Sequence, residues 1–167
     1  MRFVDIYVRQ GKVLLPTLAA RSTDIITVFE PVTVLDVTNR EKIVAAVAKA
    51  VSEPLPHVHL IDPAAHARTK PLPRAVKERS WTAFAKPARL WVLKEQGQNL
   101  VLVSTHHAYN YGFQEDDQPI RVWPGDTDPA TVAKEALDLI LQSAEEGASQ
   151  HTQLAERPAS PISDGAA

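Results

Sequence analysis

Residues 3–18 of this 167-residue chain are FVDIYVRQGKVLLPTL, and this stretch decides the fold. Its two strand-like runs, 3–9 and 12–18, are separated by Gln10-Gly11, and a two-residue loop with glycine is typical of a tight hairpin turn. A similar pattern, RLWVLKEQGQNLVLVST, occupies residues 89–105 and has Gly97 between its two runs. The sequence therefore predicts two β-hairpins.

A third strand and then a helix are predicted after each hairpin. Residues 24–37 are rich in β-branched side chains, and Pro31 is expected to split this strand or to place it at a sheet edge. The following helix is predicted to begin at Thr38, because Thr38 and Glu41 have the spacing of a capping box. It is predicted to end before Pro54.

The second half of the chain follows the same plan. Residues 120–123 form its third predicted strand, and Asp128-Pro129 predicts a helix start, with aspartate as N-cap and proline in the first turn. Matching features recur 86 to 89 residues apart, from Gly11 with Gly97 to Thr38 with Thr127. An internal duplication and a chance alignment both explain this spacing.

These elements predict an α+β fold in which two strand-strand-strand-helix units form an antiparallel sheet packed by two main helices. Residues 1–146 are predicted to be a single domain, and residues 147–167, which lack apolar periodicity, a disordered tail. The proline-rich connector 54–88 is expected to hold only short helices, one over 72–79 and one capped by Ser80. The rings of Trp81 and Phe84 are expected to fix it to the core.

The composition excludes several classes of site. The chain has no cysteine, so it has no disulfide, zinc-thiolate site, iron–sulfur cluster or thiol nucleophile. Asp5 and Arg9 interrupt the N-terminal apolar run before it reaches the length of a signal peptide, and no window approaches the ~20 apolar residues of a membrane span. We expect a cytoplasmic protein without a membrane partner.

Motifs for catalysis or cofactor binding are not found in the sequence. It contains no Gly-rich phosphate loop, no G-x-S-x-G and no H-E-x-x-H. In a strand, His57 and His59 lie on the same face, whereas the adjacent His106 and His107 point to opposite faces and cannot chelate one metal together. We expect no metal, no cofactor and no enzymatic activity. A hydrolase that uses His106 or His107 is the weakest alternative.

The charges are segregated along the chain. Residues 68–94 have a net charge of +7, and residues 95–167 have a net charge of −9. The basic connector either folds against the acidic second unit or leaves fields of opposite sign that steer partners. Aromatic residues flank the acidic run 115–117, so we predict a partner-binding surface for a basic protein. Its candidate residues are Tyr109, Tyr111, Phe113, Glu115, Asp116, Asp117, Asp126 and Asp128.

The basic segment 68–94 supports an alternative function. Eight bases interleaved with Trp81, Phe84 and Trp91 supply phosphate contacts and stacking faces, which single-strand nucleic-acid binders combine. A chain pI of about 6.3 and the prolines, which spread the bases around a loop, argue against nucleic acid as the partner.

The order of elements over residues 1–141 resembles that of a group of bacterial immunity proteins from contact-dependent growth inhibition systems. The most specific part is KERSWTAF, residues 77–84, although the family's lysine usually stands directly before the Ser-Trp pair. The resemblance implies an inhibitor that binds the C-terminal toxin domain of its cognate system, often a nuclease, and occludes it. The family supplies no motif that locates the binding surface.

Overall fold

The computed structural model describes residues 1–21, 25–59, 70–108 and 112–155, with side chains up to 144. Its strands join into one sheet in the order β3-β2-β1-β4-β5-β6, and β7 also pairs with β5. The paired strands are antiparallel. The α+β prediction with an antiparallel sheet is therefore confirmed.

The first half contains β1 (Phe3–Arg9), β2 (Lys12–Ala20), β3 (Ile26–Asp36) and α1 (Arg40–Ser52). Two short helices follow, α3 (Pro71–Ala75) and α4 (Trp81–Ala85). The second half contains β4 (Arg89–Gln96), β5 (Asn99–His107), β6 (Phe113–Glu115), β7 (Arg121–Pro124) and α5 (Pro129–Ala155). Both predicted hairpins are present, as is the strand predicted over 120–123, shifted by one residue.

The two halves meet at the centre of the sheet, where β1 pairs with β4 over six residue pairs from Phe3–Lys94 to Val8–Arg89. Outward from this seam, β2 and β3 follow β1, and β5 and β7 follow β4. The strand order is therefore the same in both directions from the seam, as an internal duplication would produce. In the first hairpin, Gln10 (φ 47°) and Gly11 (φ 73°) both have positive φ, as a type I′ turn requires.

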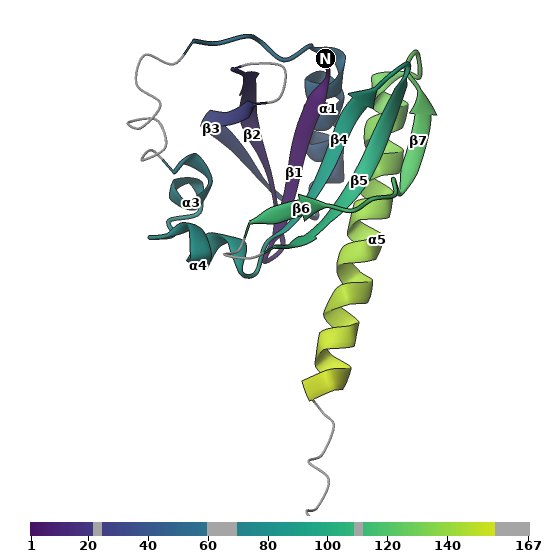
Figure 1. Cartoon of the computed structure of the whole chain (residues 1–167). Helices are drawn as coiled ribbons and strands as arrows, with labels where there is room; N and C mark the ends of the chain where they lie inside the picture. The colour runs from purple at the N-terminus through teal and green to yellow at the C-terminus, as the bar shows by residue number, and fades with distance from the viewer. Residues whose placement is uncertain (22–24, 60–69, 109–111, 156–167) are drawn as a thin grey trace, which may run out of the picture.

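The helices α1 and α5 pack together on one face of the sheet, and α5 extends past the sheet (Figure 1). Alternate strand residues point towards them, including Val4 and Ile6 of β1 and Trp91 and Leu93 of β4. With Ile43, Val47, Ala136 and Ile140 of the helices they form the larger apolar core. We call this face of the sheet the helix face.

The opposite face, here called the open face, is covered in part by α3, α4 and β6. Phe84 is fully buried there, and its ring lies 5.7 Å from that of Tyr7 and 5.3 Å from that of Trp81. The Arg9 side chain, which is 7% exposed, donates to the Phe84 carbonyl oxygen at 3.2 Å and pairs with Glu78. The expectation that these rings fix the connector to the core is confirmed for Phe84.

Two details at the helix ends differ from the prediction. The α1 N-cap is Asn39 and not Thr38, because the Thr38 hydroxyl donates to Asp36 Oδ1 at 2.7 Å, so the predicted capping box does not form. Ser80 does cap α4, since its Oγ accepts from the Ala83 amide at 3.1 Å. The helix predicted over 72–79 is shorter and lies at Pro71–Ala75.

The prediction of a disordered tail from residue 147 is wrong for residues 147–155, which continue α5. Ala148, Gln150, Gln153, Leu154 and Ala155 are good helix formers, so the absence of apolar periodicity did not exclude a helix here. Residues 156–167 lie outside the described residues. The sequence also failed to predict β6, and β2 and β5 are each two residues longer than expected.

The structure predicts that Phe84→Ala lowers the free energy of unfolding by about 3–5 kcal/mol, because it leaves a cavity between the connector and the sheet. Urea denaturation measures this loss. The neighbouring exposed substitution Lys86→Ala is the control and is expected to change stability by less than about 0.5 kcal/mol. A loss below about 1 kcal/mol for Phe84→Ala would show that the connector is not part of the core.

Candidate functional site

The strand β6 determines where most of the predicted site residues lie. It pairs with the far end of β5, from Thr105–Glu115 to His107–Phe113, and crosses the open face in front of β1 (Figure 1). The Phe113 ring packs edge-on to Tyr7 at 5.7 Å and to Trp81 at 6.2 Å. Phe113 is half-buried and helps to hold β6 on the sheet.

Glu115 is paired within the protein. Its carboxylate forms an ion pair with Lys94 of β4, so a base from the positive segment neutralises an acid of the predicted site. Asp5 of β1 lies on the same face, half-buried, and its carboxylate accepts no hydrogen bond from any residue that the structure describes. Burial, with a smaller contribution from the nearby Glu115 charge, raises the pKa of Asp5 to about 7. The same burial raises the pKa of Tyr7 well above its usual value.

Asp5 was not among the residues singled out from the sequence. The signal was a single acid within the apolar strand FVDIYVR, at a position that alternation places with Phe3 and Tyr7. The crossing of β6 adds the smaller contribution to its raised pKa, because it brings Glu115 near Asp5.

Asp116 anchors the segment that follows β6. Its carboxylate accepts from the Ser104 hydroxyl and contacts His106 Nδ1 at 2.7 Å, and these hydrogen bonds, that of Ser104 first, lower the pKa of Asp116. Serine and histidine therefore bind the same carboxylate. A catalytic triad instead places histidine between serine and aspartate, so this group has the residues of a triad without its geometry.

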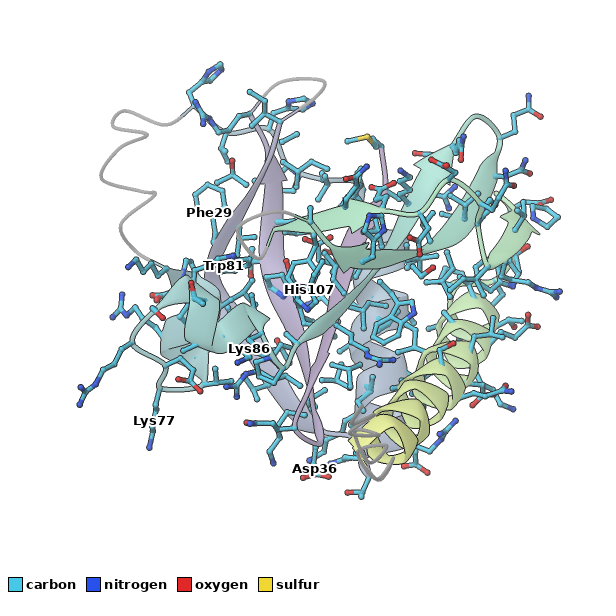
Figure 2. All side chains as sticks on the ribbon, turned by 60° about the horizontal axis from the view of Figure 1, so that its bottom comes forward. Phe29, Asp36, Lys77, Trp81, Lys86 and His107 are labelled. Carbon is cyan, nitrogen blue, oxygen red and sulfur yellow. The ribbon has the colours of Figure 1, made fainter. Side chains whose placement is uncertain are left out.

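His107 points elsewhere and lies against Phe113, with ring centres 4.8 Å apart (Figure 2). The two adjacent histidines thus have different partners, as strand alternation predicts. No group of three potential metal ligands occurs within the described part of the chain.

The remaining predicted acids do not gather beside β6. Asp128 caps α5, because its carboxylate accepts from the Thr131 amide at 3.0 Å. Asp126 follows Gly125, whose amide donates to Gln98, whereas the Asp116 amide donates to Ser104. Gln98, just before β5, and Ser104 of β5 are six positions apart, which corresponds to about 20 Å along a strand. Tyr109 and Tyr111 lie outside the described residues.

Three of the predicted acids do border one depression on the open face, here called the β5–β7 depression. Val101 and Val103 lie at its floor and are each only 4% exposed, and most of the residues that line it are polar or charged. Asp117 is exposed and forms no ion pair within the described ranges, and Ile120 and Val122, 38% and 48% exposed, lie beside it in the chain. The residues that line the depression are Lys94, Gln96, Asn99, Val101, Val103, Glu115, Asp116, Asp117, Pro119 and Val122.

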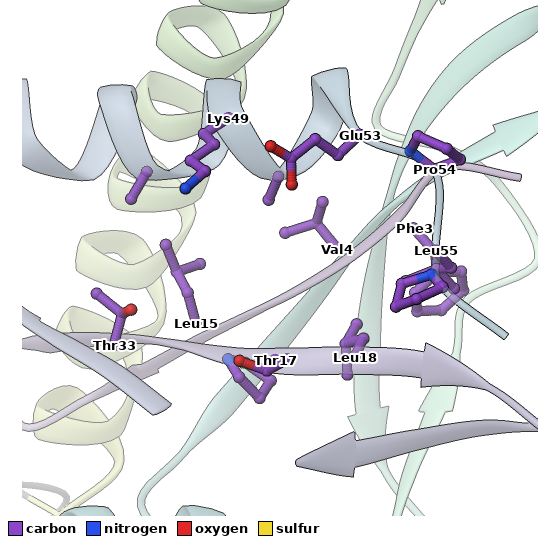
Figure 3. Close-up of a pocket in the computed structure, with 14 residues that line it drawn as sticks. Phe3, Val4, Leu15, Thr17, Leu18, Thr33, Lys49, Glu53, Pro54 and Leu55 are labelled. Carbon is purple, nitrogen blue, oxygen red and sulfur yellow. The ribbon is translucent and has the colours of Figure 1, made fainter. Parts of the chain in front are cut away.

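Another pocket lies on the helix face, between α1 and the first hairpin (Figure 3). Leu15 and Leu18 contribute apolar walls, and Lys49 and Glu53 of α1 border it. All four of its charged or hydroxyl-bearing side chains, Thr17, Thr33, Lys49 and Glu53, belong to exposed residues. Small-molecule sites usually orient their ligand with a few enclosed polar groups. This pocket is hollow but has no enclosed polar side chain among the described residues that line it.

Comparison with known proteins extends the description of the fold only. A protein of unknown function from Neisseria meningitidis, NMB0488, has a similar structure, with a TM-score of 0.60 and 11% sequence identity. The similarity covers 81% of this chain and 92% of that one. No protein-family model and no curated protein matches the sequence. No described helix has the length and apolar character needed to cross a membrane.

The raised pKa of Asp5 predicts a pH dependence of stability. Between about pH 4 and pH 7 the folded protein retains a proton on Asp5 that the unfolded chain has lost, so this group makes the free energy of unfolding fall as pH rises. Asp5→Asn removes this contribution. The variant is therefore expected to gain stability relative to the wild type as pH rises through this range, with the largest gain above pH 7.

Urea denaturation at several pH values measures the difference in the free energy of unfolding between the variant and the wild type. The contributions of the other titrating groups cancel in this difference. Asp126→Asn, an exposed acid without an ion pair to any described residue, is the matched control and should show no such gain. If Asp5→Asn gives a difference that is constant with pH, Asp5 ionises normally in the folded protein.

Proposed function

We propose that this protein is an immunity protein of the contact-dependent growth inhibition type, which binds a toxin domain in the cytoplasm and neutralises it by occlusion. The observation that carries the proposal is the β5–β7 depression, in which acidic side chains border the exposed apolar side chain of Val122. An apolar centre with a polar rim is the usual anatomy of a protein–protein interface.

Inhibition by occlusion needs surface rather than a reactive group. A standard interface covers about 800 Å² on each partner. The depression and the exposed Ile120 and Val122 beside it supply an apolar anchor for such an interface. A few side chains near the centre of an interface contribute most of the binding energy in many complexes.

The acidic border suits a basic partner. Toxin domains that act on nucleic acids are often basic, so acids at the rim would accelerate association and resemble phosphate. Lys94 already pairs with Glu115, and Ser104 and His106 bind Asp116. Asp117 has no such partner among the described residues, so we assign to it the largest contribution to the electrostatic attraction of a basic partner.

Co-expression tests the function itself. Cells that produce the toxin domain encoded beside this gene should survive only when they also produce this protein, and the two polypeptides should purify as one complex. Cells that die although the immunity candidate is present at equal amounts would contradict the proposal. Survival without a complex would contradict occlusion.

The binding site makes a separate prediction. Asp117→Lys should lower the association rate constant for the toxin domain at low salt by about tenfold and make it less dependent on salt, because it reverses the free charge at the rim. Surface plasmon resonance at several salt concentrations measures both effects. Glu41→Lys is the control, since Glu41 is an exposed acid on α1, at the helix face. Equal rates for the two variants would exclude the depression as the docking site.

A further inference from the structure

The exposed side of α3 and α4 has a positive charge that the rest of the described protein does not neutralise. Lys70, Lys77, Arg79 and Lys86 are exposed, and none of them forms an ion pair with a described residue. Lys77 points away from the body of the protein (Figure 2). We call these four side chains, together with α3 and α4, the α3–α4 surface.

The acids beside this surface are already engaged. Glu78 pairs with the buried Arg9, and Glu30 of β3 pairs with Arg74 at 3.2 Å. Two other bases of the positive segment contact the second half of the chain. Lys94 forms an ion pair with Glu115, and Arg89 donates to the Ser143 carbonyl oxygen at 3.1 Å. Of the bases in the segment 68–94, Lys94 is therefore neutralised by an acid of the second half, whereas the four bases of the α3–α4 surface have no acidic partner among the described residues.

The fold also removes the objection that prolines disperse these bases. Lys70 and Lys77 flank the short helix α3, which carries Arg74, and all three residues are exposed. Leu72 of α3 is buried against the sheet. Because α3 and α4 contact each other, Arg79 and Lys86 extend the same region.

The side chains of the α3–α4 surface indicate whether its acidic partner is a protein or a nucleic acid. The large apolar side chains exposed in the described structure are Met1, Ile25, Val34, Ile120 and Val122, and none lies on α3 or α4. A protein interface without an apolar anchor is weak. Binding to a phosphate backbone needs only positive charges, because the release of counterions drives it.

We propose that the α3–α4 surface binds the phosphate backbone of nucleic acid without sequence preference. This activity is independent of the immunity function, which uses the β5–β7 depression. Four phosphate contacts give an expected slope of about −3 for the logarithm of the binding constant against the logarithm of salt concentration on a single strand.

Fluorescence anisotropy with a labelled 20-nucleotide oligo-dT strand tests the proposal. Lys77→Glu combined with Lys86→Glu should weaken binding at low salt by at least about tenfold and reduce the slope to about half or less. The matched control, Lys42→Glu with Lys134→Glu, makes the same change of net charge on α1 and α5, on the other side of the sheet, and should retain most of the affinity. The corresponding glutamine pair at 77 and 86 serves if the charge-reversed variant fails to fold.

Two results would overturn the proposal. One is no detectable binding of the oligonucleotide by the wild type at low salt, including the case in which the protein instead binds poly-glutamate and so prefers an acidic polypeptide. The other is equal weakening by the two pairs of substitutions, which would assign binding to overall charge. Neither result affects the immunity proposal, because the co-expression test uses a different surface and a different partner.

Discussion

The antiparallel pairing of β1 with β4 is the constraint on which the rest of the structure depends. It joins residues 3–8 to residues 89–94 and makes one sheet from two halves of the chain. Once this register is set, alternation sends Val4, Ile6, Trp91 and Leu93 to the helix face. The same register places Asp5 and Lys94 on the open face, where both lie near Glu115 after β6 has crossed the sheet.

The sequence predicted the elements whose signals are local. Turn chemistry located both hairpins at Gln10-Gly11 and at Gly97, and the start of α5 follows from Asp128-Pro129. The strand β6 has only three residues and no periodicity, and tertiary contacts of Phe113 hold it in place, so no local signal exists for it. Likewise, the Thr38 hydroxyl donates to Asp36 instead of capping α1, and the spacing of residues in the sequence does not show which of these two hydrogen bonds forms.

The predicted acidic site shows why the order of charges along a sequence does not predict which charges are available on the surface. Glu115 and Asp116 have partners on β4 and β5, Asp128 caps a helix, and Asp126 lies at the other end of β5. Of the acids in the run 115–117, Asp117 alone lacks an ion pair or hydrogen bond to a described side chain. Pairings between distant residues decide which charges remain available, and a single sequence does not contain them.

The pairing of β3 with β2 skips two residues, because Val32 lies opposite Pro16 and Phe29 opposite Thr17. The skipped residues, Glu30 and Pro31, interrupt the outer row of backbone donors and acceptors, and at the other side of the sheet β7 has four residues and ends at Pro124. Neither border offers a long regular template on which another molecule could continue the sheet. A protein with eleven residues in its outermost strand is thereby guarded against fibre-like polymerisation when it is present at high concentration.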